Sequence, residues 1–313
     1  MIYTVTLNPA LDKTVEAPGF ALDTVNRAAA VRRDAGGKGI NVAKTVRALG
    51  GECGAFCILG GATGECIRAE TERLGIPVTA CAAAGETRTN IKIVDRMLHT
   101  NTDLNEPGTP VPPQTLAQLY GLLRGAATPG DIVVLAGSLP PGAPAALYRD
   151  WAAGLAAAGV RVFLDAEGGA LRCGLEARPY FVKPNRAELE ALCGRPLPAA
   201  ADAAAEAKAL HAAGVCRVLV SLGGEGAVLA CDGPGQGVLW AHGVTVPVSS
   251  TVGAGDTMVA AFACGEAAGL PAAETLRLAV AASAAAVALP GTQAPARAQV
   301  EALLPQVRVE RME

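Results

Sequence analysis

The residues with the clearest chemical potential form one short segment, Ser250–Thr257, near the end of the chain. It reads S-T-V-G-A-G-D-T, so two glycines bracket one alanine and an aspartate follows at once. Glycines let successive backbone N–H groups converge on one point, and the helical pattern that begins here adds the positive end of its dipole. The segment predicts an anion-binding turn, Gly253–Gly255, with the Asp256 carboxylate at its edge. This pairing suits phosphoryl transfer to a hydroxyl, although taken alone it also fits an ordinary strand-to-helix turn.

A second glycine-rich segment, Gly36–Asn41, reads G-G-K-G-I-N and opens a helical pattern over Ile40–Leu49. It is not a P-loop, because no Ser or Thr follows Lys38 and the four-residue spacer between glycines is missing. A dinucleotide-binding fingerprint is absent as well. Close-approach glycines beside a lysine and an asparagine suit a small polyhydroxyl or phosphate ligand. A helix-entry turn with an exposed lysine is the alternative.

Length and composition predict one domain over residues 1–313 and exclude several classes of protein. The 26 Lys and Arg nearly balance the 29 Asp and Glu, with no basic run, which argues against nucleic-acid binding. Residues 1–7 form a strand-like run rather than a signal peptide, and no apolar stretch is typical of a membrane span, so we expect a cytoplasmic protein. Nine cysteines without a C-x-x-C pair and three separated histidines predict neither a disulfide framework nor a zinc site.

From Asp131 onward, apolar strand-like runs alternate with alanine-rich helical runs. The expected strands are Asp131–Ala136, Val160–Asp165, Tyr180–Lys183 and Arg217–Leu222; the expected helices are Pro144–Ala158, Arg186–Cys193 and Asp202–Ala213. Such alternation predicts an α/β fold with a parallel sheet covered on both faces. Ligands of such sheets bind beyond the carboxyl ends of the strands. Polar clusters follow the expected strands there: Gly137-Ser138, Asp165, Lys183–Asn185 and Ser221–Gly224.

The first third of the chain carries a different pattern. Polar and apolar residues alternate over 11–17, 28–34 and, within 89–104, over 89–95 and 99–104, which is typical of strands that are solvated on one face. We expect these strands to form a small sheet that stands off the main body. A lid over the active site and an ordinary edge hairpin are both consistent with the pattern.

Taken together, the two glycine-rich segments resemble the paired signatures of the ribokinase-like (PfkB) family of carbohydrate kinases. Further segments are similar to the branch of that family that phosphorylates sugar phosphates: T-L-N-P-A-L-D (6–12), T-R-T-N-I-K-I (87–93), L-N-E-P-G (104–108), G-S-L-P-P-G (137–142) and V-K-P-N-R-A-E-L (182–189). The resemblance implies a three-layer α/β/α sandwich with a central, mostly parallel sheet and a small β-sheet lid that pairs two subunits into a homodimer.

The implied activity is ATP-dependent phosphorylation of a ketohexose monophosphate, with fructose 1-phosphate as the expected substrate and fructose 1,6-bisphosphate as the product. Kinases for tagatose 6-phosphate or fructose 6-phosphate are the alternatives, because the choice rests on overall likeness. A non-catalytic sugar-phosphate sensor is a distant alternative, and the intact Gly253, Gly255 and Asp256 argue against it.

The resemblance also implies a role for each matching residue. By this resemblance, Asp12 and Asn41 are expected to bind the sugar hydroxyls. Lys38 and Arg88 are expected to bind the substrate's phosphate, with Arg27 from the lid of a neighbouring subunit. Gly37 and Ser138 complete the expected substrate site. The residues expected to bind ATP are Lys183, Asn185, Ser221, Gly223, Gly226, Thr251, Gly253 and Gly255. Asp165 and Glu188 are expected to bind Mg²⁺, largely through water.

Catalysis is expected to fall to the anion turn Gly253, Ala254 and Gly255 and to Asp256 as the base. With an ordinary aspartate pKa of about 3.9, Asp256 is expected to be ionised at pH 7 without tuning. Residues 284–289 are wholly apolar, so adenine recognition is expected through shape and backbone. Whether a monovalent cation binds near Ser250 and Val252 is left open.

Overall fold

The computed structural model describes residues 1–232 and 237–312. Among these residues, ten strands form one sheet in the order β14-β13-β12-β11-β10-β9-β8-β1-β4-β5. Seven neighbouring strands, from β5 to β11 in that order, pair in parallel, and the last three pair antiparallel. Their bounds are β1 Ile2–Thr6, β4 Cys53–Leu59, β5 Val78–Ala82, β8 Ile132–Ala136, β9 Arg161–Asp165, β10 Phe181–Val182, β11 Arg217–Ser221, β12 Gly226–Cys231, β13 Gly237–His242 and β14 Val309–Met312.

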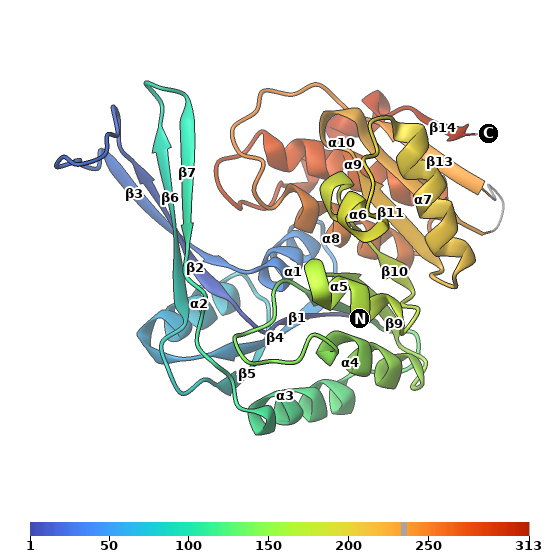
Figure 1. The fold of residues 1–313 in the computed structure, drawn as a ribbon, viewed down its shortest axis with the longest axis horizontal. Helices are drawn as coiled ribbons and strands as arrows, with labels where there is room; N and C mark the ends of the chain where they lie inside the picture. Colours follow the sequence, from blue (N-terminus) through green and yellow to red (C-terminus); the bar gives the residue numbers. More distant parts are fainter. Residues whose placement is uncertain (233–236, 313) are drawn as a thin grey trace.

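Helices cover both faces of this sheet, and each face has its own apolar core (Figure 1). One core includes helices α1 Lys38–Ala48, α2 Gly61–Arg73, α8 Ala254–Ala267, α9 Ala272–Val287 and α10 Arg297–Leu303. The other includes α3 Pro113–Ala126, α4 Leu147–Ala156, α5 Gly168–Leu175, α6 Arg186–Cys193 and α7 Ala200–Ala212. Short 3₁₀ turns lie at η1 Gly223–Glu225 and η2 Leu304–Gln306. The expected three-layer α/β/α sandwich is confirmed.

The alternating segments of the first third form a separate four-stranded sheet in the order β3-β2-β6-β7. Its strands are β2 Ala10–Glu16, β3 Ala30–Gly36, β6 Arg88–Asp95 and β7 Thr100–Asn105. Figure 1 shows this sheet projecting from the main body, and we call it the lid. The predicted bounds were one or two residues off; β3, for example, extends to Gly36, which pairs with Ala10.

Most predicted elements are present with small shifts at their ends. The helix expected over 144–158 covers only Leu147–Ala156, and the strand expected over 180–183 covers only Phe181–Val182. Helix α6 matches its predicted bounds because Asn185 caps its first turn and Gly194 ends it in a left-handed conformation. No helix among the described residues combines the length and hydropathy needed to cross a bilayer.

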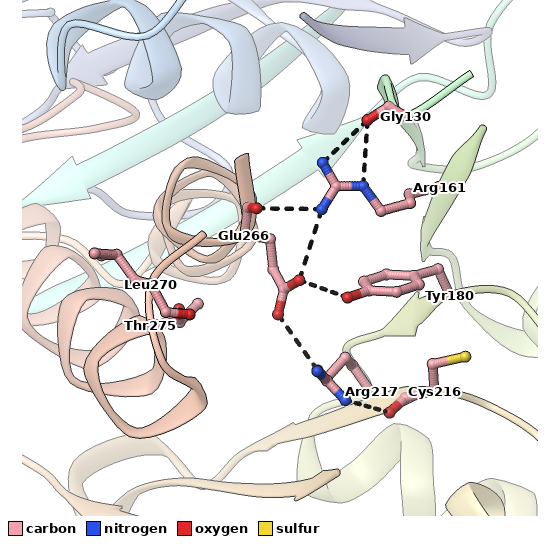
Figure 2. Close-up of polar contacts among 8 residues, drawn as sticks. All are labelled: Gly130, Arg161, Tyr180, Cys216, Arg217, Glu266, Leu270 and Thr275. Atoms are coloured by element: carbon pink, nitrogen blue, oxygen red, sulfur yellow. Dashed lines mark hydrogen bonds and ion pairs between the residues drawn. The ribbon is translucent and has the colours of Figure 1, made fainter. Parts of the chain in front are cut away.

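Helix α8 is tied to the sheet by a polar cluster at the end of the strands that lies away from the glycine turn (Figure 2). Glu266, in its last turn, accepts hydrogen bonds from the Tyr180 hydroxyl at 2.5 Å and from Arg217 Nε at 3.3 Å. Arg161 approaches the same carboxylate at 3.8 Å and donates to the Glu266 backbone carbonyl at 3.1 Å. These three partners stand at the amino ends of β9, β10 and β11, so they fix where α8 begins at the opposite end of the sheet.

Candidate active site

A cavity of about 740 Å³ lies between the carboxyl ends of the central strands and the lid. It brings together most of the residues that the sequence analysis singled out: Asp12, Gly37, Lys38, Asn41, Arg88, Ser138, Asp165, Lys183, Asn185, Glu188, Ser221, Gly253, Gly255 and Asp256. The polar clusters that follow the parallel strands therefore do converge, as the topology of such sheets predicts.

The glycine turn has the geometry of an anion-binding site. Gly253 is the N-cap of α8 and has a φ of 80°, in the left-handed region that favours glycine. A Cβ at Gly255 would lie 3.3 Å from the ammonium nitrogen of Lys183, so the glycine lets that side chain approach the turn without crowding. The first N–H groups of α8 have no partner within their helix, and the Ala254 N–H makes only a long contact of 3.4 Å with the Thr251 carbonyl. Such a helix start is suited to binding an anion.

Asp256 stands in the first turn of α8 and is 7% exposed. Its Oδ2 accepts a hydrogen bond of 2.8 Å from the Asn41 side-chain amide. Burial, reinforced by the nearby Asp165 carboxylate, raises the pKa of Asp256 to about 6, although Lys38, Asn41 and Lys183 act in the opposite direction. The expectation of an ordinary aspartate pKa was therefore wrong, because it ignored residues that only the fold brings near.

Two lysines share one carboxylate at the floor of the cavity. Asp165 is 1% exposed, and its Oδ1 lies 3.4 Å from Lys38 Nζ and 3.6 Å from Lys183 Nζ. Burial acts to lower the pKa of Lys38, but Asp165 and Asp256 outweigh it and raise that pKa, so Lys38 stays charged. Asp165 and Asp256 together offset the two lysines, whose ammonium groups are the donors that this part of the cavity offers to an anionic ligand.

Asp12 projects from the lid into the same cavity. The Asn90 amide donates to its Oδ1 at 3.1 Å, and burial raises its pKa. A Cβ at Gly36 would collide with this carboxylate, so Gly36 is required for Asp12 to take this position. The register of the lid explains the arrangement, because Asp12 is paired with Asp34 on one side and with Asn90 on the other.

The base of the lid is held by two charged side chains that the sequence analysis missed. Lys44 of α1, 7% exposed, donates to the Ala35 carbonyl at 2.7 Å, and the Glu70 carboxylate of α2 accepts from the Ala35 N–H at 2.9 Å. Burial lowers the pKa of Lys44 despite nearby carboxylates. Both contacts lie on the free edge of β3, and neither residue belongs to a motif that could have indicated it.

Arg88 lines the cavity and also joins three backbone segments. Its guanidinium donates to the carbonyls of Glu106 at 2.8 Å, Asn8 at 3.0 Å and Pro9 at 3.4 Å. Burial lowers its pKa. The Asn8 amide in turn donates to the Ser138 hydroxyl at 3.2 Å. Asn8 lies in the quoted 6–12 segment but received no predicted role, since only the folded chain shows that it orients Ser138.

Asn185 and Glu188 are tied to each other. The Asn185 side chain accepts from the Glu188 N–H, and the Glu188 carboxylate accepts from the Asn185 N–H, both at 2.8 Å. This capping box leaves the second oxygen of Glu188 available to the cavity. Ser221 is held next to Asn185 by a parallel bridge.

Some expected site residues do not line this cavity. Gly223 and Gly226 form the turn between β11 and β12, where both have left-handed φ values, and Thr251 is exposed on a neighbouring cavity of about 340 Å³. Arg27 is exposed on the lid, away from both cavities in this single chain. Thr292, which was not predicted, lines the main cavity with its Oγ1 buried and without a partner among the described residues.

A parallel α/β sandwich that carries a glycine turn, a buried carboxylate and two lysines beneath a lid defines a phosphotransferase with a hydroxyl acceptor. The chain belongs to the pfkB family of carbohydrate kinases, whose family model matches residues 5–299.

Characterised relatives and solved structures agree with that membership. The chain is 42% identical to a 1-phosphofructokinase of Rhodobacter capsulatus, over 99% of this chain and 97% of the relative. It is 40% identical to a 1-phosphofructokinase of Xanthomonas campestris pv. campestris, over 83% and 82% of the two chains. Phosphofructokinase-2 from Escherichia coli, solved in complex with substrates and products, superposes with a TM-score of 0.92 at 32% identity, covering 97% of this chain and 98% of that one.

Proposed function

We propose that this chain transfers the γ-phosphoryl group of ATP to fructose 1-phosphate and forms fructose 1,6-bisphosphate and ADP. The observation that carries the proposal is that one cavity holds the Asp256 carboxylate beside the anion turn and also the cationic side chains of Lys38 and Arg88. A substrate that offers a primary hydroxyl at one end and a phosphate at the other fits this arrangement. Relatives named 1-phosphofructokinase support the choice of sugar.

In this proposal Asp256 accepts the proton of the attacking hydroxyl while the bond between the γ-phosphorus and the bridging oxygen of ATP breaks. The transition state of such reactions is loose, so positioning matters more than basicity. The N–H groups of Ala254 and Gly255 stabilise the charge on the transferred group. The Asn41 amide N–H donates to Asp256, and the buried Oδ1 of Asn41 has no partner among the described residues. That oxygen is the atom we assign to a sugar hydroxyl, together with the Asp12 carboxylate.

The anionic parts of the two substrates are assigned to different walls. Lys38 and Arg88, with Ser138 and Gly37, take the sugar's phosphate. Lys183, Asn185, Ser221, Gly253 and Gly255 take the phosphates of ATP, with Gly223, Gly226 and Thr251 at the outer end of the nucleotide. Arg88 donates to three backbone carbonyls, but its guanidinium has five N–H donors, so others remain for the substrate.

Asp165 and Glu188 fit a divalent ion held mostly through water. The second oxygen of Asp165 is buried without a partner among the described residues, and Glu188 lines the same cavity. No three carboxylate, histidine or cysteine side chains in the described part of the chain cluster tightly enough to hold a metal alone. Mg²⁺ tolerates this, because it retains waters and binds substrate phosphates, and it would neutralise charge on the transferred group. A monovalent cation near Ser250 and Val252 stays a prediction; phosphofructokinase-2 from Escherichia coli has been solved in complex with potassium.

We also propose that the lid pairs two copies of the chain. Six exposed large apolar residues lie on the lid or its connecting loops: Leu22, Val25, Val31, Met97, Leu98 and Leu104. Leu104 is one position out of phase with Asn105, which lines the cavity, so the side chain of Leu104 lies on the outer face. An apolar sheet face is commonly covered by another surface. In such a dimer, Arg27 would approach the partner's cavity.

The expected cytoplasmic location stays a prediction.

A coupled assay for ADP release with a panel of sugars tests the substrate. We expect kcat/KM for fructose 1-phosphate to exceed that for fructose 6-phosphate and tagatose 6-phosphate by at least about tenfold, or roughly 1.4 kcal/mol. Free fructose should be poorer still, because Lys38 and Arg88 would lack an anion. A preference for a sugar 6-phosphate would contradict the proposed substrate but not the proposed kinase activity. The similarity to phosphofructokinase-2 makes fructose 6-phosphate the second candidate, in a reversed pose.

A further inference from the structure

The lid carries one arginine whose charge is incompletely used. Arg32 lies on β3, and its Nε donates to the Asp34 carboxylate at 2.7 Å. Its Nη2 is buried and has no hydrogen-bond partner among the described residues. Arg88, by contrast, directs its donors to three backbone carbonyls of the same region. A buried N–H donor without an acceptor is unfavourable, and a ligand oxygen removes that cost.

This donor lies beside the active site, because Arg32 lines the neighbouring cavity of about 340 Å³, which shares Val252 and Gly291 with the cavity that holds Asp256. A Cβ on Gly291 would collide with Arg32 Nη2, so the guanidinium is packed directly on that glycine, which has a left-handed φ of 65°. Thr292 follows, and its backbone and side chain lie 3.6 Å from the position of a Cβ on Gly253. Gly291 and Thr292 both line the cavity that holds Asp256. Two residues therefore separate Arg32 from the anion turn.

We propose that Arg32 is a further catalytic residue, which reaches from the lid to the phosphoryl group in transfer and donates to one of its oxygens. The inference rests on the proposed function as a kinase, but not on the identity of the sugar. Asp34 lines the cavity of Asp256 and accepts from Arg32 Nε, so it holds the guanidinium beside residues of the active site, with Nη2 packed against Gly291. An arginine that supplies donors to a transferring phosphoryl group stabilises the charge that spreads over its oxygens.

Arg33 is a matched control on the same strand. It is the adjacent residue, so it points to the opposite face of the lid, and it is exposed. Its replacement removes the same charge from the same strand without touching the cavity.

Three measurements test the proposal in the full-length protein. Arg32→Ala should lower kcat by about tenfold to 100-fold, with a smaller change in the KM of the sugar phosphate. Added guanidinium chloride, at concentrations that leave the parent folded, should restore part of this activity. In the absence of sugar, Arg32→Ala should also lose about tenfold in affinity for the β,γ-imido analogue of ATP, relative to ADP. Arg33→Ala should stay within about twofold of the parent in every measurement.

The nucleotide comparison separates this proposal from the choice of substrate, because it involves no sugar. If no ketohexose phosphate is a substrate but the ratio of the two nucleotide affinities falls, Arg32 keeps its assignment and the substrate is wrong. An unchanged nucleotide ratio together with an unchanged kcat overturns the role of Arg32. Equal losses in Arg32→Ala and Arg33→Ala, without rescue by guanidinium, would show that only the stability of the lid had changed and would also overturn it.

Discussion

The contact between Asn41 and Asp256 joins the two glycine-rich segments of the chain at a single hydrogen bond. These residues are 215 positions apart, yet the amide of one holds the carboxylate of the other at 2.8 Å. The sequence predicted each motif and its residue types, because glycine turns and helix starts are local features. It did not predict the raised pKa of Asp256, since burial and the approach of Asp165 arise from the packing of α8 against distant strands.

Asp256→Asn should lower kcat by about 10² or more, the usual effect of removing a positioned base. In the parent, kcat/KM should fall as the pH drops below about 6, because the carboxylate then becomes protonated. Turnover within a few-fold of the parent would contradict the assignment of Asp256 as the base.

The same variant should be more stable than the parent at high pH. A carboxyl whose pKa rises from 3.8 to about 6 on folding stabilises the protein below its unfolded pKa and loses that contribution as the pH rises through 6. Asparagine avoids this loss, so denaturant unfolding at pH 8 should favour Asp256→Asn by at most roughly 3 kcal/mol. The difference should shrink near pH 4.

Arg88→Lys tests the assignment of Arg88 to the sugar's phosphate, because Arg88 also donates to backbone carbonyls of the cavity wall. Lysine retains the charge but cannot reproduce the fork that joins Asn8, Pro9 and Glu106. We expect the KM of the sugar phosphate to rise about tenfold or more, with little change in the KM of ATP, since a charge-assisted bond is worth roughly 1.5–3 kcal/mol. Equal increases for both substrates, measured by steady-state kinetics, would move Arg88 to the nucleotide side.

Among the helices and strands, those with clear local signals at their ends were predicted accurately from the sequence. Helix α6 was predicted correctly because a capping box and a terminal glycine define both of its ends. The two-residue strand β10 was overestimated by one residue at each end, because Tyr180 and Lys183 flank the paired residues Phe181 and Val182 without joining the ladder. The alternation of the lid strands was visible, whereas the register that places Asn90 beside Asp12 depends on a parallel pairing between distant segments.

Gly36→Ala tests how tightly the lid is joined to the sugar site. The added methyl group would meet the Asp12 carboxylate and displace it. We expect the KM of the sugar phosphate to rise about tenfold, with the KM of ATP within about twofold. Gly121→Ala is the matched control, because nothing lies within 4 Å of its Cβ position in helix α3. A Gly36→Ala enzyme with unchanged kinetics would show that Asp12 can move without cost.

The apolar outer face of the lid predicts that two copies of the protein associate. Leu104→Lys places a charge at a residue that is 64% exposed in the single chain, so it should leave the fold intact and dissociate the dimer. Sedimentation velocity should show a dimer for the parent and a monomer for the variant. Leu122→Lys, at an exposed leucine of α3, should remain dimeric. A parent that is monomeric at micromolar concentration would contradict the proposed pairing.

The polar contacts of Glu266 restrict how helix α8 can unfold locally. Helix α8 is held at its first turn by the contact of Asp256 with Asn41 and at its last turn by Tyr180, Arg161 and Arg217 (Figure 2). Its central residues, Val259–Ala263, are fully buried. Backbone amides of such an element exchange with solvent deuterium only when the whole domain unfolds. Mass spectrometry should therefore find α8 among the slowest-exchanging segments of the protein.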